Sequence, residues 1–471
     1  MSGFLHGVET LEVKKGAVPI TIVRSAVVGL VGIAPKGPVN TLTLVSSKND
    51  AEQFGSELDG FTIPQALNAI FAQGAGQVIV VNVLDEGDNL ASVVDEVVAV
   101  ANGKFTSEFQ PVGSSYSVKN SAGSITYTEG THYSKDDFGV FTILDLDTLP
   151  NGTSLKVSYD YLDTTTLTPE QFVGTAGVSP TGLEAFALAQ GTFGFDAKIF
   201  IAPDIQELDL DGVNQALQVA ADAYRGVCIL DGPNSGSVSQ VIAARGNAGS
   251  FYGWGTSSQR TILAFPNVLV PNLRTGNSDT RSVTPYVAGV ICAQDSENGY
   301  WWSPSNREIK GITAPLTTIS ASINDPNSEA NQLNAAGIVT IFNAFGTGFR
   351  LWGNRNASFP SASDPQTFIP VRRTADVIHV SVEQAMLQFL DRPLNQAIID
   401  AIRESVNSFI RTLIGRGALI DGVCRYDVTK NPPTELAAGH LTFDIDFMPP
   451  VATERITFES FINIDYLKNL K

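Results

Sequence analysis

The feature that most limits the possible folds is an alternation of short apolar segments with amphipathic ones, which is interrupted once. Residues 26–33 are uncharged and apolar, as expected of a buried strand. A helix predicted at 64–73 leads to a second apolar strand at 78–84. The same order resumes after residue 181, and further strands are expected at 197–202, 226–231 and 261–265. Strands and helices that alternate at this spacing favour a largely parallel central sheet.

The interruption, residues 101–180, has a different pattern. Short β-forming segments are separated by Gly, Asn and Asp turns, with no helical period between them, at 116–119, 124–128, 140–144 and 155–161. This spacing predicts a small all-β sandwich inserted into the α/β chain. Residues 85–195 contain fifteen acidic residues, four lysines and no arginine, so we expect the insertion to face solvent.

The C-terminal part combines a long helix with two alternating strands. The helix is expected to begin at Pro393 and to end at Gly415 or Gly417, because apolar residues recur every three or four positions: Leu394, Ile398, Ile402, Val406, Phe409 and Leu413. In the two strands that follow, apolar residues alternate with polar ones, so that each strand has one apolar face. These faces contain Leu441, Phe443, Ile445 and Phe447 in the first strand, and Ile456, Phe458, Ile462 and Ile464 in the second.

These patterns predict a multidomain chain of the α+β or α/β class, and a length of 471 residues also favours two or three domains. Residues 1–24, which alternate only loosely, are expected to form an extended arm that packs with the C-terminal domain. The α/β middle domain is expected to comprise 25–100 and 181–357, and the outward-facing β-sandwich 101–180. The C-terminal domain, with a second arm at its end, is expected at 358–471.

Charge and composition exclude one class of function and favour self-association. The net charge is −18, whereas a nucleic-acid-binding protein needs clustered Lys and Arg to neutralise phosphates. Only 17% of residues are charged, compared with a soluble average of about 25%. This low fraction fits a protein whose surface is largely covered by copies of itself.

The cysteines and the N-terminal sequence bear on the compartment. Cys228, Cys292 and Cys424 lie far apart, and the first two are within apolar runs, so we expect reduced thiols in the core and assembly in a reducing cytoplasm. The first residues do not resemble a signal peptide, and no uncharged apolar run approaches the roughly 18 residues that span a bilayer. We therefore expect a soluble protein that is not exported by a leader.

Motifs for catalysis or ligand binding are not recognisable. Four histidines are scattered singly, without partners at metal-ligand spacing: His6, His132, His379 and His440. The Gly-rich stretches 74–76 and 346–348 lack the position and the Lys-Ser/Thr pair of a phosphate loop. Asp444 and Asp446 alternate with apolar residues, as on a solvated strand face. We therefore predict no catalytic, metal-binding or cofactor-binding residues, and a protein that is not an enzyme.

Several motifs occur in a fixed order along the chain. They are Thr-Pro-Tyr-Val-Ala-Gly-Val at 284–290, Gly-Tyr-Trp-Trp-Ser-Pro-Ser-Asn at 299–306, Leu-Trp-Gly-Asn-Arg at 351–355, Val-Arg-Arg at 371–373, Gly-His-Leu-Thr-Phe at 439–443 and Pro-Pro-Val-Ala-Thr-Glu-Arg-Ile at 449–456. Together with residues 26–32 before Ala34-Pro35, this series resembles the contractile tail sheath family of phages, R-type bacteriocins and related injection machines. About two thirds of the chain is covered, without the β insertion. Where the family often has Thr after Trp-Gly-x-Arg, this chain has Asn356.

The resemblance implies a structural subunit that polymerises as stacked hexameric rings around an inner tube. It also implies contraction from a metastable extended state, which drives the tube through a target cell envelope. Expected partners are copies of the chain, the inner tail tube protein, and baseplate and tail terminator proteins, with neither nucleic acid nor direct membrane insertion. The particle would be assembled in the bacterial host cytoplasm, as a virion tail or phage-tail-like particle, and the C-terminal domain would lie on the inside.

The resemblance also implies that terminal arms add strands to sheets of neighbouring subunits. The N-terminal arm would act through Val8, Glu12, Val13, Pro19 and Ile20. The C-terminal strands would act through Leu441, Phe443, Ile445, Ile456, Phe458 and Ile462. Lys468 and Lys471 are candidate contacts with acidic residues of the tube, although a solvated tail is an equal alternative.

The remaining motif residues are expected to have structural roles: Trp302, Pro304, Asn306, Trp352, Gly353, Arg355, Arg372 and Arg373. With Arg350, the three arginines form a cationic cluster that either pairs with other subunits or braces the loop after Trp352, and we favour bracing. Two rival classes are an α/β enzyme with a β insertion, for which no pocket motif is present, and another self-assembling tail or shell protein. An adhesin domain would fit the insertion alone.

Overall fold

The computed structural model describes residues 20–469 except 75, 114, 206–209, 211, 247–253, 273–275 and 344–345. Its centre is a nine-stranded sheet in the order β16-β19-β18-β13-β12-β11-β1-β3-β2. Six strands are parallel: β1 (Val27–Gly32), β3 (Gln77–Asn82), β11 (Ile199–Ile201), β12 (Val227–Asp231), β13 (Thr261–Ala264) and β18 (Ile338–Asn343). Antiparallel strands complete the two ends: β2 (Thr43–Val45), β19 (Phe349–Trp352) and β16 (Arg307–Glu308). The predicted largely parallel sheet is confirmed.

Helices cover both faces of this sheet, which is why its central strands are apolar throughout. On one face, Val28 and Leu30 of β1 pack with α2 (Ile63–Ala72) and α8 (Thr284–Glu297). On the other face, Val27 and Val31 belong to a core that includes α6 (Val213–Ala223) and the 3-10 helix η3 (Gly182–Leu188). Shorter elements at the rim are α1 (Lys48–Ala51), η1 (Glu52–Phe54), α5 (Ala189–Phe193), α7 (Val238–Gly246), α9 (Glu329–Ala335), β14 (Val268–Pro271), β15 (Ser278–Arg281) and β17 (Ala314–Pro315).

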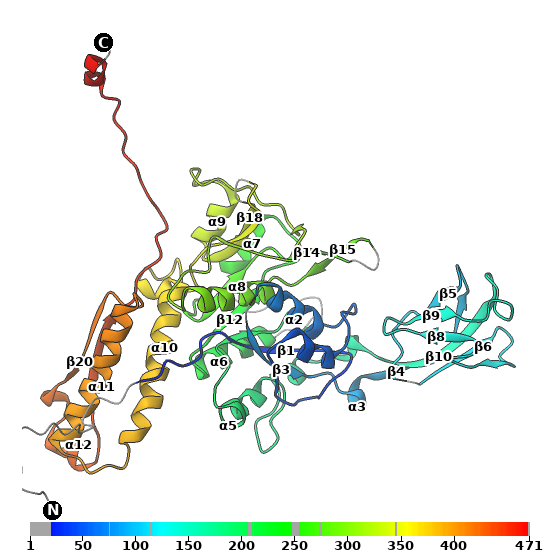
Figure 1. Cartoon of the computed structure of the whole chain (residues 1–471), viewed down its shortest axis with the longest axis horizontal. Helices are drawn as coiled ribbons and strands as arrows, with labels where there is room; N and C mark the ends of the chain where they lie inside the picture. Colours follow the sequence, from blue (N-terminus) through cyan, green and yellow to red (C-terminus); the bar gives the residue numbers. More distant parts are fainter. Residues whose placement is uncertain are drawn as a thin grey trace, which may run out of the picture.

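The insertion consists of two small antiparallel sheets that share one core. One sheet has the order β4-β10-β6-β7, formed by Leu90–Ala99, Ser154–Leu162, Tyr116–Asn120 and Thr126–Tyr127. The other has the order β5-β9-β8, formed by Lys104–Thr106, Val140–Ile143 and Tyr133–Lys135. Phe105 and Phe141 stack at 4.5 Å in the shared core. Figure 1 shows this unit projecting from the sheet on the side away from the C-terminal domain.

The limits of this insertion differ from the predicted 101–180. β4 precedes residue 101, yet it pairs with β10 from Leu90 to Ala99 and therefore belongs to the insertion. At the other end, α4 (Pro169–Val173) buries Phe172 in the core of the central sheet. Two short helices lie where the chain enters and leaves the insertion: α3 (Glu86–Asn89) precedes β4, and η2 (Thr164–Thr166) follows β10. We therefore propose 90–162 as the limits of the β unit.

The C-terminal domain is built on two long helices. α10 (Ile369–Met386) and α11 (Gln396–Gly415) share a core with Ile378, Phe409 and Leu413, and α12 (Pro433–Ala437) lies at the far end. α11 starts three residues later than predicted, because the side chain of Asn395 caps it by accepting from Ile398 N at 3.0 Å. Leu394, expected on the buried face, is therefore outside the helix and exposed.

A buried ion pair joins three segments where the two domains meet. Arg373 of α10 donates to both carboxylate oxygens of Asp295 of α8, at 2.8 and 2.6 Å, and both side chains are at least 95% buried. Ser25 donates to the same carboxylate at 2.6 Å. Just before it, Ile20 and Ile22 pack against the core of the C-terminal domain, and Figure 1 shows this segment running from α10 to β1.

Candidate assembly site

The C-terminal domain contains a sheet of two strands within the described part of the chain. β20 (Asp421–Tyr426) pairs antiparallel with β21 (Phe443–Met448), with Cys424 opposite Ile445. Among the described residues no third strand joins either edge. Phe443, Ile445 and Phe447 pack against the core beneath α11. Unpaired edges expose backbone N–H and C=O groups, so this sheet can accept a strand from another chain.

This pairing changes the role of the first predicted C-terminal strand. Phe443 and Ile445 lie in β21, which is bonded to its own chain, and Leu441 lies two residues before that strand. A strand held in this way is not available for donation. We therefore restrict the donated segment to residues after Met448.

We call residues 449–469 the C-terminal arm. The second predicted strand lies here, but the described arm contains no strand, only an extended chain followed by the 3-10 helix η7 (Ile464–Asn469). Figure 1 shows the arm leaving the body and ending far from it. Ile456, Phe458 and Ile462 are 70%, 88% and 99% exposed. Strand-like alternation is thus present without a partner strand.

The root of the arm is attached to the α/β domain by one ion pair. Arg355, three residues after β19, donates from Nε to Glu454 at 2.7 Å and from Nη2 at 2.5 Å. The arginine side chain is 15% exposed and the glutamate side chain 40%. The third nitrogen of the guanidinium, Nη1, donates to Thr367 Oγ1. Phe368 lies against the guanidinium, with its ring centre 3.5 Å from Cζ.

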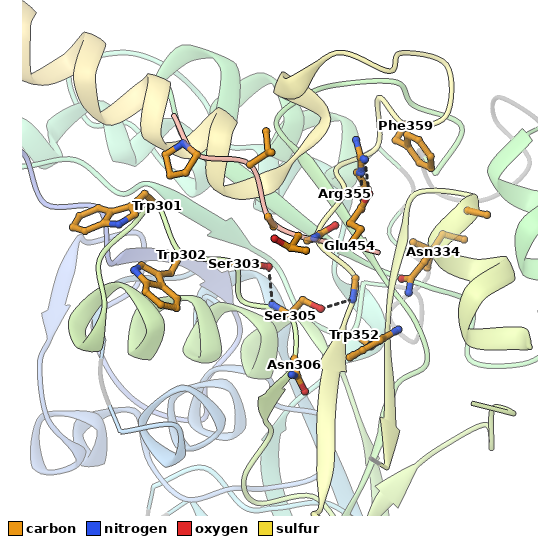
Figure 2. A pocket seen from close by; sticks show the side chains of 18 of the residues that line it. Trp301, Trp302, Ser303, Ser305, Asn306, Asn334, Trp352, Arg355, Phe359 and Glu454 are labelled. Atoms are coloured by element: carbon orange, nitrogen blue, oxygen red, sulfur yellow. Dashed lines mark hydrogen bonds and ion pairs between the residues drawn. The ribbon is translucent and has the colours of Figure 1, made fainter. Parts of the chain in front are cut away.

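A pocket of about 810 Å³ lies between this root and the body (Figure 2). The body contributes aromatic and polar side chains, including Trp301, Trp302, Asn306, Asn334 and Trp352. The arm contributes residues 450–454, and the end of α11 contributes Arg416 and Gly417. Most of the motif residues therefore surround the place where the arm begins.

The Trp352 motif forms one wall of this pocket through backbone contacts. Gly353 N donates to Ser305 Oγ at 3.0 Å, and Asn306 N donates to Leu351 O at 2.6 Å. The Asn334 amide is oriented so that its nitrogen donates to Ile338 O and Trp352 O, and its oxygen accepts from Trp352 Nε1 at 3.2 Å. A Cβ on Gly353 would collide with the Asn334 side chain, and its φ of +123° also favours glycine. Pro304 is buried beside this turn, whereas half of Trp302 is exposed.

The four arginines of the predicted cationic cluster have four different partners, of which Glu454, the partner of Arg355, is described above. Arg372 pairs with Asp376 on its own helix at 2.8 Å, and Arg260 pairs with the same carboxylate at 2.8 Å. Burial raises the pKa of Asp376 although both arginines oppose this change. Arg350 donates to Asn306 O at 2.8 Å. Arg373 pairs with Asp295, and within one chain these contacts supply the partners that bracing would use.

The predicted terminal contacts are described only in part. Val8, Glu12, Val13, Pro19 and Lys471 lie outside the described residues. Lys468 pairs with Asp465 at 2.6 Å within η7, and both side chains are exposed.

Two buried titratable groups of the body have shifted pKa values. Asp231, at the end of β12, accepts from Ser282 Oγ at 2.5 Å and from Val283 N at 3.1 Å, and so anchors the start of α8. Burial raises its pKa to about 6. Burial lowers the pKa of His379 to about 4, and the positive charge of the nearby Arg225 contributes less to the same shift.

Among the described residues, no group of three or more His, Cys, Asp or Glu could hold a metal ion. A helix long and apolar enough to cross a membrane was not found among them either.

Sequence reasoning missed the acidic partners of the arginines. Glu454 was noted only as part of a motif, and Asp295 and Asp376 were given no role. A signal for Glu454 does exist, since it follows Pro449-Pro450, which separate it from the preceding strand. The distance of about 100 residues between Arg355 and Glu454 hid the pairing.

Family models match three parts of the chain. They are described as tail sheath protein Gp18 domain III N-terminal region, matching residues 25–83, phage tail sheath protein central domain, matching 176–357, and phage tail sheath C-terminal domain, matching 361–463. None of the three covers the β insertion.

Relatives and solved structures agree with these matches. The tail sheath protein of Burkholderia phage BcepMu is 40% identical over 100% of this chain and 99% of its own length. The tail sheath protein of Escherichia phage P2 is 27% identical over 62% of this chain and 69% of its own. The sheath of an extracellular contractile injection system in its contracted state, from the PVC sheath complex, superposes with a TM-score of 0.60 at 14% identity, covering 99% of both chains. The contracted helical sheath of the anti-feeding prophage gives 0.60 at 16% identity, over 98% of this chain and 100% of the other.

Proposed function

The chain belongs to the phage tail sheath family and is a structural subunit of a contractile tail sheath, and from this we propose that it polymerises by exchange of its terminal arms. In this proposal the subunits form stacked hexameric rings around an inner tube. The C-terminal arm of one subunit adds a strand to the β20–β21 sheet of another. This proposal is supported by the presence of two features in one subunit: an extended, exposed apolar arm, and a two-stranded sheet whose edges no described strand covers.

Arm exchange would gain interaction energy from backbone hydrogen bonds and from apolar burial. Adding one strand forms roughly four to six backbone hydrogen bonds, which contribute about 4–6 kcal/mol before ordering costs. Burying Ile456, Phe458 and Ile462 contributes a further ~1.5–3 kcal/mol for each side chain. These contacts repeat at every subunit, so the rings stay linked while packed domains rearrange.

Contraction is then a change between two packings of the same linked subunits. We propose that the extended packing is metastable and that contraction buries more surface, which drives the tube through a target envelope. The baseplate and tail terminator proteins would bind the two ends of the cylinder. The particle would be assembled in the bacterial cytoplasm and would form a virion tail or a phage-tail-like particle.

Two deletions test the arm exchange. Removal of residues 455–471, or separately of residues 1–19, is expected to abolish the formation of cylinders in negative-stain images. The C-terminal deletion should leave the thermal unfolding of the subunit unchanged, because residues 455–469 bury almost nothing within it. Normal cylinders from either variant would contradict the corresponding exchange.

A charge reversal tests the contact with the tube. We propose that Lys468 and Lys471 pair with acidic residues of the inner tube protein. Lys468→Glu/Lys471→Glu should reduce co-assembly of sheath and tube, measured by co-sedimentation. The matched control is Lys119→Glu/Lys135→Glu, which makes the same change of charge in the insertion. Equal co-assembly by both double variants would remove the tube contact and favour a solvated tail.

A further inference from the structure

The guanidinium of Arg355, at the end of the α/β domain, is held in a fixed position by the segment that leads into α10. Thr367 accepts from Nη1, and the rings of Phe368 and Phe359 lie 3.5 and 4.8 Å from Cζ. Arg355 also forms an antiparallel backbone bridge with Phe368. Nε and Nη2, the two remaining donor positions, therefore face outward with a set direction. A planar pair of donors held in this way suits a carboxylate, which it binds through two parallel hydrogen bonds.

Glu454 fills this position from the arm. It lies six residues after the end of β21, which belongs to the C-terminal domain. By pairing with Arg355, it connects the root of the arm to the α/β domain. Between these two attachments the root passes over the 810 Å³ pocket, so residues 450–453 are not tightly packed against the body. Beyond Glu454, the described arm makes hydrogen bonds only within itself. Glu454 is thus its last fixed point.

We infer that Arg355 and Glu454 are a positioning pair that sets the direction in which the C-terminal arm leaves the subunit. The inference rests on the proposed exchange of arms. A chain segment whose root is already oriented loses less conformational freedom on binding than a free one. The pair therefore favours insertion of the arm into the neighbouring sheet without contacting that neighbour itself. It also couples the arm to the α/β domain.

The test compares two glutamates of the same arm. Glu454→Gln removes the charge that Arg355 binds, whereas Glu459→Gln makes the same chemical change at an exposed position farther along. Spin labels on Ser361→Cys and Ser460→Cys report the distance between body and arm, and labelling is selective because the three native cysteines are buried. Measurements are made below the concentration at which cylinders form.

Glu454→Gln should broaden the distribution of distances and raise the critical concentration for assembly about three- to tenfold. Arg355→Lys, which keeps the charge but loses the paired donors, should lie between this variant and the unmodified protein. Glu459→Gln should match the unmodified protein in both measurements. The thermal unfolding midpoint of Glu454→Gln should fall only slightly, which separates positioning from general stability.

Three results would overturn the inference. They are an unchanged distance distribution in Glu454→Gln, a broadened distribution without any change in assembly, and equal effects of Glu454→Gln and Glu459→Gln. Failure of the proposed arm exchange is recognised separately, because it would appear as normal cylinders from the variant that lacks residues 455–471.

Discussion

β1 and the C-terminal arm are both extended and rich in apolar residues, yet their environments are opposite. All six residues of β1 are buried, and the strand is bonded to β3 on one edge and to β11 on the other. In the arm, Phe458 and Ile462 are almost fully exposed, and no described strand pairs with them. Composition alone does not separate the two segments. What separates them is whether the same chain supplies a partner.

This difference shows where a sheath subunit is complete and where it is not. The central strands of the body are paired within the chain, and the buried charges of Arg373 and Asp295 satisfy one another. The arm leaves large apolar side chains in water, an arrangement that marks an interaction site in a soluble protein. The low fraction of charged residues, 17%, agrees with a surface that copies of the chain will cover.

The contrast between body and arm is also expected for two ion pairs, and breaking the buried one should give the largest loss of unfolding free energy. Asp295→Ala leaves the buried charge of Arg373 without its partner and should cost ~3–5 kcal/mol of unfolding free energy. Glu454→Ala breaks a partly exposed pair at the root of the arm and should cost ~1 kcal/mol or less. Urea unfolding followed by tryptophan fluorescence measures both. Similar losses in the two variants would show that the arm root is part of the folded core.

A second pair of substitutions compares the two apolar segments directly. Leu30→Ala removes a side chain that is fully buried in β1, which should cost ~2–5 kcal/mol of unfolding free energy. Phe458→Ala should change that free energy by less than ~0.5 kcal/mol, because the ring has no contacts to lose. For assembly we expect the opposite ranking: Phe458→Ala should reduce the yield of cylinders more than Leu30→Ala does.

An exposed apolar residue outside the arm provides the control. Val178 is fully exposed on the body, and Val178→Ala should affect neither unfolding nor assembly. If Phe458→Ala assembled as well as Val178→Ala, the exposed ring would have no role in exchange. Turbidity and negative-stain imaging measure the yield in both cases.

Much of the body could be predicted from the sequence, because its signals are local. The apolar runs at 26–33 and 78–84 became β1 and β3, and the helix expected at 64–73 became α2. The helical spacing of Ile402, Val406 and Phe409 correctly identified the buried face of α11. In each case one segment contains the whole pattern, and the core of the same chain completes it.

Predictions failed where the deciding contact lies far away in the sequence. β4 was assigned to the α/β domain because its pairing with β10, about 60 residues later, has no local signature. The strand expected after Pro450 has the right alternation, but a strand needs a neighbour and the described chain offers none. The Arg355–Glu454 pair joins positions 99 apart for the same reason. The residues at these sites were visible in the sequence, but their partners were not.

A pH-dependent effect is predicted for Asp231, a buried carboxyl group that accepts hydrogen bonds from Ser282 and Val283 of the same chain. Burial raises its pKa to about 6 from the ordinary value of 3.8, so between these pH values the unfolded chain binds fewer protons than the folded one. Its contribution to stability is therefore largest below pH 4 and is lost as the pH rises to 6, by about 2–3 kcal/mol. Asp231→Asn cannot titrate, so the unmodified protein should lose stability relative to this variant between pH 4 and 7.

Taking the difference between the two proteins removes the opposite contribution of His379, whose lowered pKa acts equally in both. Glu459→Gln, in the arm, is the control for a change of one net charge. Urea unfolding at pH 4, 5, 6 and 7 provides the four differences for each variant. A difference that stayed constant for Asp231→Asn would mean that the carboxylate is solvated in the folded subunit. The start of α8 would then be as open to water as the arm, and the contrast between body and arm would not extend to buried charge.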